Sequence, residues 1–308
     1  MELNEVATAL SEDGFAVIKD HLQSDTVEEL RQESERLLLL DGARSTRHPP
    51  GWDEVVAAGE RSDAIARCLV DPWVIAAAVS QLGPDIELAS SGEVDRKRRR
   101  STASLCQWHA DFTWMPFVQR PRPFPWIAAY FFMSDVDEDS GPIWVVPGSH
   151  LWATEPNHRV CEQHPEPDSI PGARPLVGGA GTLALLNNEA WHMSPANLSD
   201  SDRLFIRVQL KPAWMRPWTH SQPSLEFVRS ASEPVGRQLL GAYDYDSVSW
   251  EYGVDATLDR YPVVDWLSRE GLDIRQYLHS NDSYCKGELD EQLRRWKPDD
   301  HVGAELLG

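Results

Sequence analysis

The sequence has few cysteines, no excess of positive charge and no long apolar run, and each shortage excludes a class of protein. Its four cysteines are far apart in 308 residues and include no C-x-x-C pair, so neither a zinc site nor a disulfide framework is indicated. The formal net charge of -20 would repel nucleic acid and anionic membranes at long range. The longest strongly apolar run, residues 126–133, is too short to cross a bilayer.

The first residues are acidic and lack the basic and then apolar pattern of a secretory signal. We therefore expect a soluble, cytoplasmic protein that acts on a small molecule and has no nucleic-acid or membrane partner. Composition does not fix the oligomeric state. The one basic segment, residues 96–100 (RKRRR), has the composition of a localisation signal, an anion-docking patch or a solvated loop. Its polar neighbours favour a solvated, mobile loop, which is our prediction.

Helical patterns dominate the first eighty residues, and strand patterns follow. Ser24 begins a helix with an acidic first turn, and Asp71 followed by proline caps a second helix that Gly83 ends. Residues 14–18 form a predicted short strand. From about residue 85 the pattern becomes short apolar runs separated by turn formers, which is typical of an all-β sandwich or barrel. The further predicted strands are residues 86–90, 105–111, 126–134, 143–146, 182–186 and 204–210.

We predict a single domain over residues 1–308, because no repeat or linker marks a second one. It consists of a mainly helical part (1–84), a β core (85–218) and a C-terminal extension (219–308).

A His-x-Asp pair, His109 and Asp111, lies at the end of a predicted strand, and His192 follows another strand about eighty residues later. Residues two apart on a strand point to the same side, so both members of the pair can bind one ion. Two histidines and a carboxylate are the ligands of a mononuclear non-haem iron(II) site that leaves positions open for a co-substrate and dioxygen. A second His-x-Glu at residues 164–166 lies in a proline-rich stretch typical of a surface loop, so we assign it no metal.

Arg203, eleven residues after His192, indicates the co-substrate. Turn formers at residues 194–202 return the chain, so the next strand runs back beside His192 and carries Arg203 deeper into the barrel than the metal. A guanidinium can bind a carboxylate through two parallel hydrogen bonds. A keto acid that chelates iron at one end and meets Arg203 at the other has the dimensions of 2-oxoglutarate. Arg207 shares the strand face and is the alternative, but spacing from His192 favours Arg203.

Three segments together carry a family resemblance: residues 108–112 (WHADF), 139–150 (DSGPIWVVPGSH) and 191–199 (WHMSPANLS), the last followed by Arg203. In order and spacing they closely resemble the phytanoyl-CoA dioxygenase family, which are iron(II)- and 2-oxoglutarate-dependent oxygenases and include the ectoine hydroxylases. The resemblance covers about residues 14–218. It implies a mainly β fold, the double-stranded β-helix (jelly-roll or cupin-like), with N-terminal helices packed on one sheet. Met193 departs from the family pattern and would change the pocket wall.

The resemblance also implies a reaction. His109, Asp111 and His192 would bind Fe(II), and dioxygen would oxidatively decarboxylate 2-oxoglutarate while an unactivated C–H bond of a small molecule is hydroxylated, in specialised metabolism. Related halogenases replace the carboxylate with a small residue, so Asp111 favours hydroxylation. Desaturation, epimerisation and ring formation remain open as outcomes of the same cofactor chemistry. A non-catalytic β-helix that only binds a ligand is the alternative from another class.

Further residues near the motifs are candidates for the pocket. Aromatic rings there could stack on a substrate or hold a cationic group, and polar groups on the metal-facing side of a strand could contact the co-substrate. The candidates are Gln107 and Tyr130 for the co-substrate, and Trp114, Trp126 and Met193 for the substrate. His150 follows a Pro-Gly turn and is expected to hydrogen-bond the following loop rather than to bind a metal.

Overall fold

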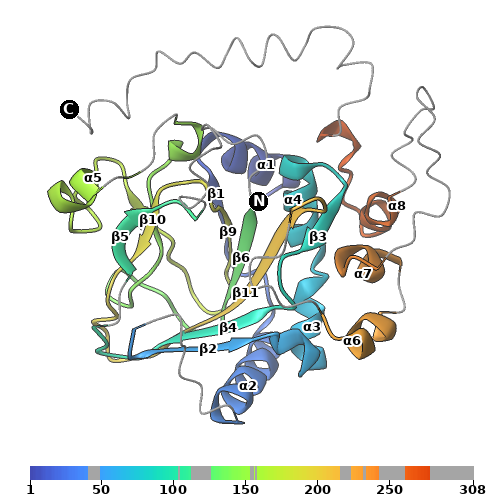
Figure 1. The fold of residues 1–308 in the computed structure, drawn as a ribbon, viewed down its shortest axis with the longest axis horizontal. Helices are drawn as coiled ribbons and strands as arrows, with labels where there is room; N and C mark the ends of the chain where they lie inside the picture. The colour runs from blue at the N-terminus through green and yellow to red at the C-terminus, as the bar shows by residue number, and fades with distance from the viewer. Residues whose placement is uncertain are drawn as a thin grey trace, which may run out of the picture.

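Two antiparallel sheets form the centre of the molecule in a computed structural model (Figure 1). The structure describes residues 1–40, 49–102, 105–111, 126–152, 156, 158–215, 223–231, 234–242 and 261–277. The large sheet has the order β1–β9–β6–β11–β4–β2, and β3 pairs with the end of β11. The small sheet has the order β5–β10–β7–β8. The strands are β1 (Phe15–Ile18), β2 (Trp52–Val56), β3 (Ile86–Leu88), β4 (Glu93–Lys97), β5 (Leu105–His109), β6 (Ile127–Phe132), β7 (Trp144–Val145), β8 (Arg174–Pro175), β9 (Leu183–Asn187), β10 (His192–Ser194) and β11 (Arg203–Pro212).

Strands β6 and β9 of the large sheet are buried on both faces, and this is why they are nearly continuous apolar runs. On β6, Ile127, Ala129 and Phe131 belong to one core cluster that includes the helices. The intervening residues, Tyr130 among them, belong to a second cluster on the other face. The period of two therefore separates the helix-facing side of β6 from the side that faces the small sheet.

Helices cover the first of these faces. In Figure 1, α3, α4 and the C-terminal helices lie on the opposite side of the large sheet from β5 and β10. Of the expected C-terminal extension, the described parts are short helices, and α8 packs against α4 and α7. The α-helices are α1 (Leu3–Glu12), α2 (Ser24–Leu40), α3 (Asp63–Leu69), α4 (Pro72–Leu82), α5 (His158–Gln163), α6 (Leu225–Ser230), α7 (Pro234–Leu239) and α8 (Pro262–Arg269), and the short 3-10 turns are Ala58–Glu60, Ser149–Leu151 and Arg275–Tyr277.

Helix α4 begins and ends where the sequence predicts. The Asp71 carboxylate accepts the backbone N–H groups of Trp73 at 3.0 Å and Val74 at 3.1 Å, and these donors have no partner inside the helix. Gly83 ends the helix in a positive-φ conformation (φ 79°). The stretch Asp63–Leu82 is long and apolar enough to cross a membrane by length and composition. Residues 74–79 are nevertheless buried in the core of this structure.

The strands predicted from apolar runs are all present, but the prediction of a loop at residues 96–100 is wrong for its first residues. Arg96 and Lys97 belong to β4, which pairs with β2 and β11. Lys97 is fully buried. The cause is tertiary pairing of charge, since Arg96 binds Asp53 of β2 at 2.7 Å. Strands β2, β8 and β10 were also not predicted.

Candidate active site

The two parts of the metal motif meet across the small sheet. His109 is the last residue of β5 and His192 is the first residue of β10, and they are direct partners in the antiparallel register. Their ring centroids are 4.2 Å apart. Asp111 lies in the turn after β5, where its backbone N–H donates to the Asn188 carbonyl at 3.0 Å. Strand pairing therefore brings His192 to the His109–Asp111 pair, which lies about eighty residues earlier in the sequence.

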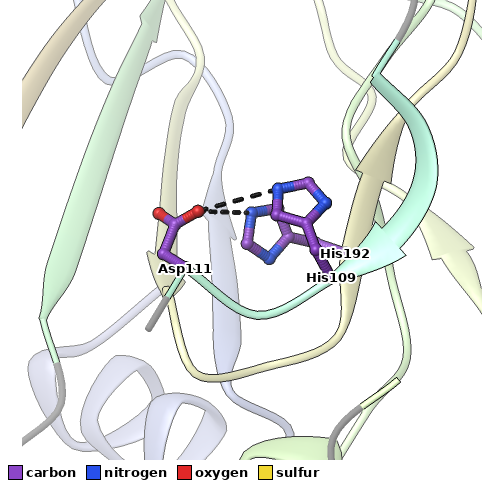
Figure 2. A group of neighbouring side chains, drawn as sticks. All are labelled: His109, Asp111 and His192. Atoms are coloured by element: carbon purple, nitrogen blue, oxygen red, sulfur yellow. Dashed lines mark ion pairs between the residues drawn. The ribbon is translucent and has the colours of Figure 1, made fainter. Parts of the chain in front are cut away.

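The three side chains converge (Figure 2). Nε2 of His109 is 3.6 Å from Asp111 Oδ1, and Nε2 of His192 is 3.5 Å from the same oxygen. The opposite ring nitrogens donate to backbone carbonyls, His109 Nδ1 to Gln107 at 2.9 Å and His192 Nδ1 to Ala190 at 2.8 Å. A proton held on Nδ1 leaves the Nε2 lone pair free for a metal, which is the usual way in which ligand histidines are oriented.

The electrostatics of this triad suit metal binding at neutral pH. Burial lowers the pKa of His109 to about 4, and the neighbouring His192 acts in the same direction. Burial opposes ionisation of Asp111, but contact with His192 and the charge of both histidines hold the pKa of Asp111 below its ordinary value. Burial also disfavours protonated His192, but Asp111 outweighs this effect and raises the pKa of His192. An ionised Asp111 beside a neutral His109 is the protonation state that a metal site requires.

The donor set fits ferrous iron. One ligand atom from each residue of the triad lies within 4.8 Å of the others, and within the described ranges no other group of His, Cys, Asp or Glu does so. Two imidazoles and one carboxylate are the protein ligands of non-haem iron(II) oxygenases, which leave positions open on the metal.

Arg203 is a buried cation that lacks a carboxylate partner among the described residues. It is 1% exposed at the start of β11. Its Nη1 donates to the Gly141 carbonyl and, at 3.1 Å, to Ser194 Oγ, while its Nε has no hydrogen-bond partner. Burial lowers the pKa of Arg203 to about 10. A buried guanidinium with an unsatisfied donor is a fitting receptor for the carboxylate of an incoming molecule.

Gly141 lies in the segment 139–150 that resembles the family, and a side chain at this position would clash with the backbone. It adopts a positive φ of 69°, and a Cβ there would come within 2.7 Å of the Pro195 carbonyl oxygen. The residue must be small for its own carbonyl to reach Arg203.

Arg207 has the opposite environment, and this distinguishes the two arginines. Its Nη2 binds Glu93 and lies 3.4 Å from Glu54, and its Nε lies 3.4 Å from Asp95. Burial would lower the pKa of Arg207, but these carboxylates raise it well above its ordinary value. Because three carboxylates surround Arg207, it is Arg203 that can receive a new anion, as the spacing from His192 predicts.

One cavity of about 70 Å³ connects the triad to Arg203. It is lined by Trp52, Asp95, His109, Asp111, Tyr130, Ile143, His192, Ser194, Arg203, Phe205 and Arg207. Tyr130, a candidate from the sequence, is therefore in contact with this cavity. The triad and Arg203 therefore line one shared cavity, as a co-substrate that bridges them would require.

Three other candidates lie elsewhere. The Gln107 side chain is exposed and does not line the cavity, although its carbonyl orients His109. Met193 belongs to an apolar cluster with Trp108 and Trp144, because strand alternation turns it away from the face of His192 and Ser194. Trp126 is buried against Ala89.

Trp114 lies outside the described residues. His150 hydrogen-bonds the Ser11 carbonyl at 3.1 Å through Nε2, so this partner lies in α1 and not in the loop that follows His150.

Sequence reasoning missed five cavity residues: Trp52, Asp95, Ile143, Ser194 and Phe205. Ser194 lies two residues after His192, so strand alternation alone would have placed it on the metal-facing side. Trp52 lies on β2, a strand with too few apolar residues to be recognised, and no signal in the sequence connects it to the site.

Relatives of known sequence share this site region. The sequence model of the phytanoyl-CoA dioxygenase (PhyH) family matches residues 10–205, which include the triad and Arg203. The ectoine dioxygenase of Stutzerimonas stutzeri is 23% identical over 252 residues, 73% of this chain and 82% of the relative. That of Nocardia farcinica is 26% identical over 225 residues, 65% and 74% of the two chains. An uncharacterized protein of Mycobacterium tuberculosis is 28% identical over 158 residues, 47% of this chain, and the match spans half of that relative's length.

Solved structures share the fold. HygX from Streptomyces hygroscopicus, with nickel, 2-oxoglutarate and hygromycin B bound, superposes with a TM-score of 0.58 at 21% identity over 70% of this chain and 89% of that one. The α-ketoglutarate-dependent epimerase SnoN from nogalamycin biosynthesis gives 0.54 at 23% identity over 70% and 85%. The expected mainly β jelly-roll fold is thereby confirmed. With a family match over well more than half of its residues, the chain belongs to the phytanoyl-CoA dioxygenase (PhyH) family.

Proposed function

We propose that this protein is an Fe(II)- and 2-oxoglutarate-dependent dioxygenase that hydroxylates an unactivated C–H bond of a small molecule in specialised metabolism. One observation carries the proposal. The convergent nitrogens of His109 and His192, the Asp111 carboxylate and the carboxylate-free Arg203 all face one cavity. That arrangement suits a metal at one end and the distal carboxylate of a 2-oxo acid at the other.

Each residue has a defined task in this proposal. His109, His192 and Asp111 hold Fe(II), which supplies the activation of dioxygen that drives decarboxylation of 2-oxoglutarate and oxidation of the substrate. The Gln107 and Ala190 carbonyls keep the histidine protons on Nδ1. Arg203 and Ser194 receive the distal carboxylate and fix the orientation of the keto acid. The carboxylate of Asp111 occupies the place that halogenases leave to halide, and so favours hydroxylation.

The relatives support a small-molecule substrate and leave two outcomes for it. Ectoine dioxygenases, a structure with hygromycin B bound and an enzyme of nogalamycin biosynthesis all involve small molecules. The likeness to the epimerase SnoN makes epimerisation the second candidate, with desaturation and ring formation as further variants of the same cofactor chemistry. The mass of the product separates these outcomes, because hydroxylation adds oxygen, epimerisation leaves the mass unchanged and desaturation removes two hydrogens. We also propose a cytoplasmic location.

Anaerobic titration tests the cofactor assignment. Purified protein with ferrous iron should bind 2-oxoglutarate and develop the weak visible charge-transfer band of the iron chelate. His109→Ala should abolish the band, because the metal loses one of its three protein ligands. His164→Ala, in the second His-x-Glu copy, is the matched control and should leave the band intact. A band that persists in His109→Ala would contradict the proposal. Absence of succinate formation with every substrate pool tested would instead favour a binding protein without catalysis.

A further inference from the structure

Trp52 contacts two buried cations at the carboxylate-receiving end of the cavity. Its ring centroid lies 4.4 Å from Lys97 Nζ and 5.5 Å from Arg203 Cζ. Lys97 and Arg203 are direct partners on the neighbouring strands β4 and β11, and β2 places Trp52 beside both. Trp52 itself is 6% exposed and lines the cavity. The Trp52 ring therefore contacts two positive charges that are both removed from water.

The groups in direct contact with Arg203 in the described structure are neutral. Arg203 is held by the Gly141 carbonyl, the Ser194 hydroxyl and two rings, those of Trp52 and, at 4.4 Å, Phe205. A ring face stabilises a guanidinium through its quadrupole and does not neutralise the charge. Four residues along the same strand, Arg207 is surrounded by carboxylates instead. The π faces thus keep Arg203 in place while its charge remains available for an anion.

The indole N–H adds a second effect. Trp52 Nε1 donates to Asp95 Oδ1 at 3.4 Å, and the other oxygen of Asp95 lies 3.4 Å from Arg207 Nε. Asp95 is the acidic side chain that acts most strongly on Arg203. A contact that holds this carboxylate on the Arg207 side keeps an internal competitor away from Arg203.

We propose that Trp52 is a specificity-determining positioning residue, whose ring face holds Lys97 and Arg203 as a receptor for the distal carboxylate of a 2-oxo dicarboxylate. This inference rests on the proposed function. Lys97 contributes from behind the cavity wall, where its Nζ binds Ser194 Oγ at 2.7 Å and so fixes the hydroxyl that also contacts Arg203. The π face of Trp52, and not only the volume of its side chain, then sets the preference for a dicarboxylate over a monocarboxylate.

A comparison of two keto acids tests the role of the ring. 2-Oxoglutarate and 2-oxopentanoate have the same chain length, but only the first has a distal carboxylate. Their dissociation constants are measured anaerobically on ferrous protein from the visible band, and on nickel-loaded protein by calorimetry. Trp52→Leu should raise the Kd of 2-oxoglutarate about tenfold, equivalent to about 1.4 kcal/mol, and change that of 2-oxopentanoate less than twofold. Trp52→Phe keeps a weaker π face and should raise only the first constant, about threefold.

The controls separate positioning from folding. Trp266→Leu, in α8 and away from the cavity, should change neither constant. If Trp52→Leu fails to fold, the test rests on Trp52→Phe alone. Dissociation constants for the two keto acids that are unchanged in Trp52→Phe, or raised by the same factor, would then overturn the inference. Equal losses for both keto acids in Trp52→Leu would show that Trp52 is only a structural wall and would overturn it too. Failure of the wild-type protein to bind either keto acid would reject the proposed function, and the inference with it.

Discussion

At the scale of single residues, the two arginines of β11 show how local charge decides between binding and structure. Arg203 and Arg207 lie on one face of one strand, and both are enclosed by protein. Arg203 meets neutral oxygens and rings, whereas Arg207 meets Glu54, Glu93 and Asp95. Burial of a charge without a counter-charge is unfavourable, so a buried arginine with no carboxylate partner among the described residues indicates a binding function. An arginine surrounded by carboxylates indicates a structural role.

This contrast predicts opposite phenotypes for two matched substitutions. Arg203→Met should raise the Kd of 2-oxoglutarate at least about a hundredfold, because it removes a charge-assisted contact worth about 3 kcal/mol. The same substitution should leave the free energy of unfolding unchanged or raise it. Arg207→Met removes a cation that contacts three buried carboxylates and should destabilise the fold by about 3–5 kcal/mol. Urea unfolding and the anaerobic titration measure both quantities. Comparable stability losses in the two variants would show that the distinction is wrong.

His109 predicts the pH dependence of the metal-free fold. Its pKa is about 4 in the folded protein, below the ordinary value of 6.5, so the unfolded chain takes up the proton first as the pH falls. Its contribution to stability is therefore complete above pH 6.5 and is lost progressively as the pH falls toward 4. The raised pKa of His192 acts with the opposite sign, and its contribution is lost as the pH rises through its folded pKa.

The measurement compares wild type with His109→Asn, both with a chelator, by urea unfolding at pH 7.0, 5.5 and 4.5. The substitution removes the acid-sensitive contribution of His109, so the wild type should lose more stability than the variant between pH 7.0 and 4.5. A difference between the two proteins that stays constant over this range would be inconsistent with the lowered pKa.

At the scale of elements, the basic strand β4 anchors the turn that separates His192 from Arg203. Lys97 Nζ binds the Pro195 carbonyl at 2.5 Å, and the backbone N–H of Arg99 donates to Asp202 at 2.8 Å. Asp53 on β2 in turn binds both Arg96 and Arg98. This basic segment thus contributes to the geometry of the site, and the charges of Arg96, Arg98 and Arg100 are matched by acidic residues distant in the sequence.

Asp53 is the acidic residue on which this arrangement depends most, and two substitutions test it. Its carboxylate is buried, so Asp53→Asn should lower the free energy of unfolding by about 1.5–3 kcal/mol, the range for hydrogen bonds to charged groups. Asp200→Asn, at the exposed pair with Arg100, is the control and should change it by less than about 0.5 kcal/mol. Guanidinium chloride would screen these pairs, so urea is the denaturant. A larger effect at Asp200 would contradict this ranking.

The same elements explain what the sequence could and could not predict. The helix α4, with its Asp71 cap, and the apolar strands β6 and β9 follow local rules, and so does the triad, whose spacing reflects one strand end and one strand start. Strands β2 and β4 are held by cross-strand ion pairs such as Asp53 with Arg96, and no local pattern reveals such partners. Trp52 was missed for that reason, because the position of a side chain on an unrecognised strand cannot be assigned.

At the scale of the whole molecule, helices and large sheet share one apolar core. A single cluster of buried residues extends from Leu3 in α1 through the strands of the large sheet to Leu267 in α8 and Ile274 beyond it. The active-site cavity lies on the other face of that sheet, next to a second apolar cluster. The core therefore supports the site from behind, across the large sheet.

Leu267→Ala tests whether the expected single domain extends to the C-terminal helices. Leu267 is fully buried, so its truncation should lower the free energy of unfolding by about 2–5 kcal/mol. If α8 belongs to the same cooperative unit as the sheets, the midpoint of one urea transition should shift, with tryptophan fluorescence and far-ultraviolet circular dichroism coinciding. The Kd of 2-oxoglutarate should stay unchanged, because the substituted side chain faces the opposite side of the large sheet from the triad. A second unfolding transition at lower urea concentration, with the main transition unchanged, would instead show that the C-terminal helices unfold independently. That result would overturn the single-domain prediction.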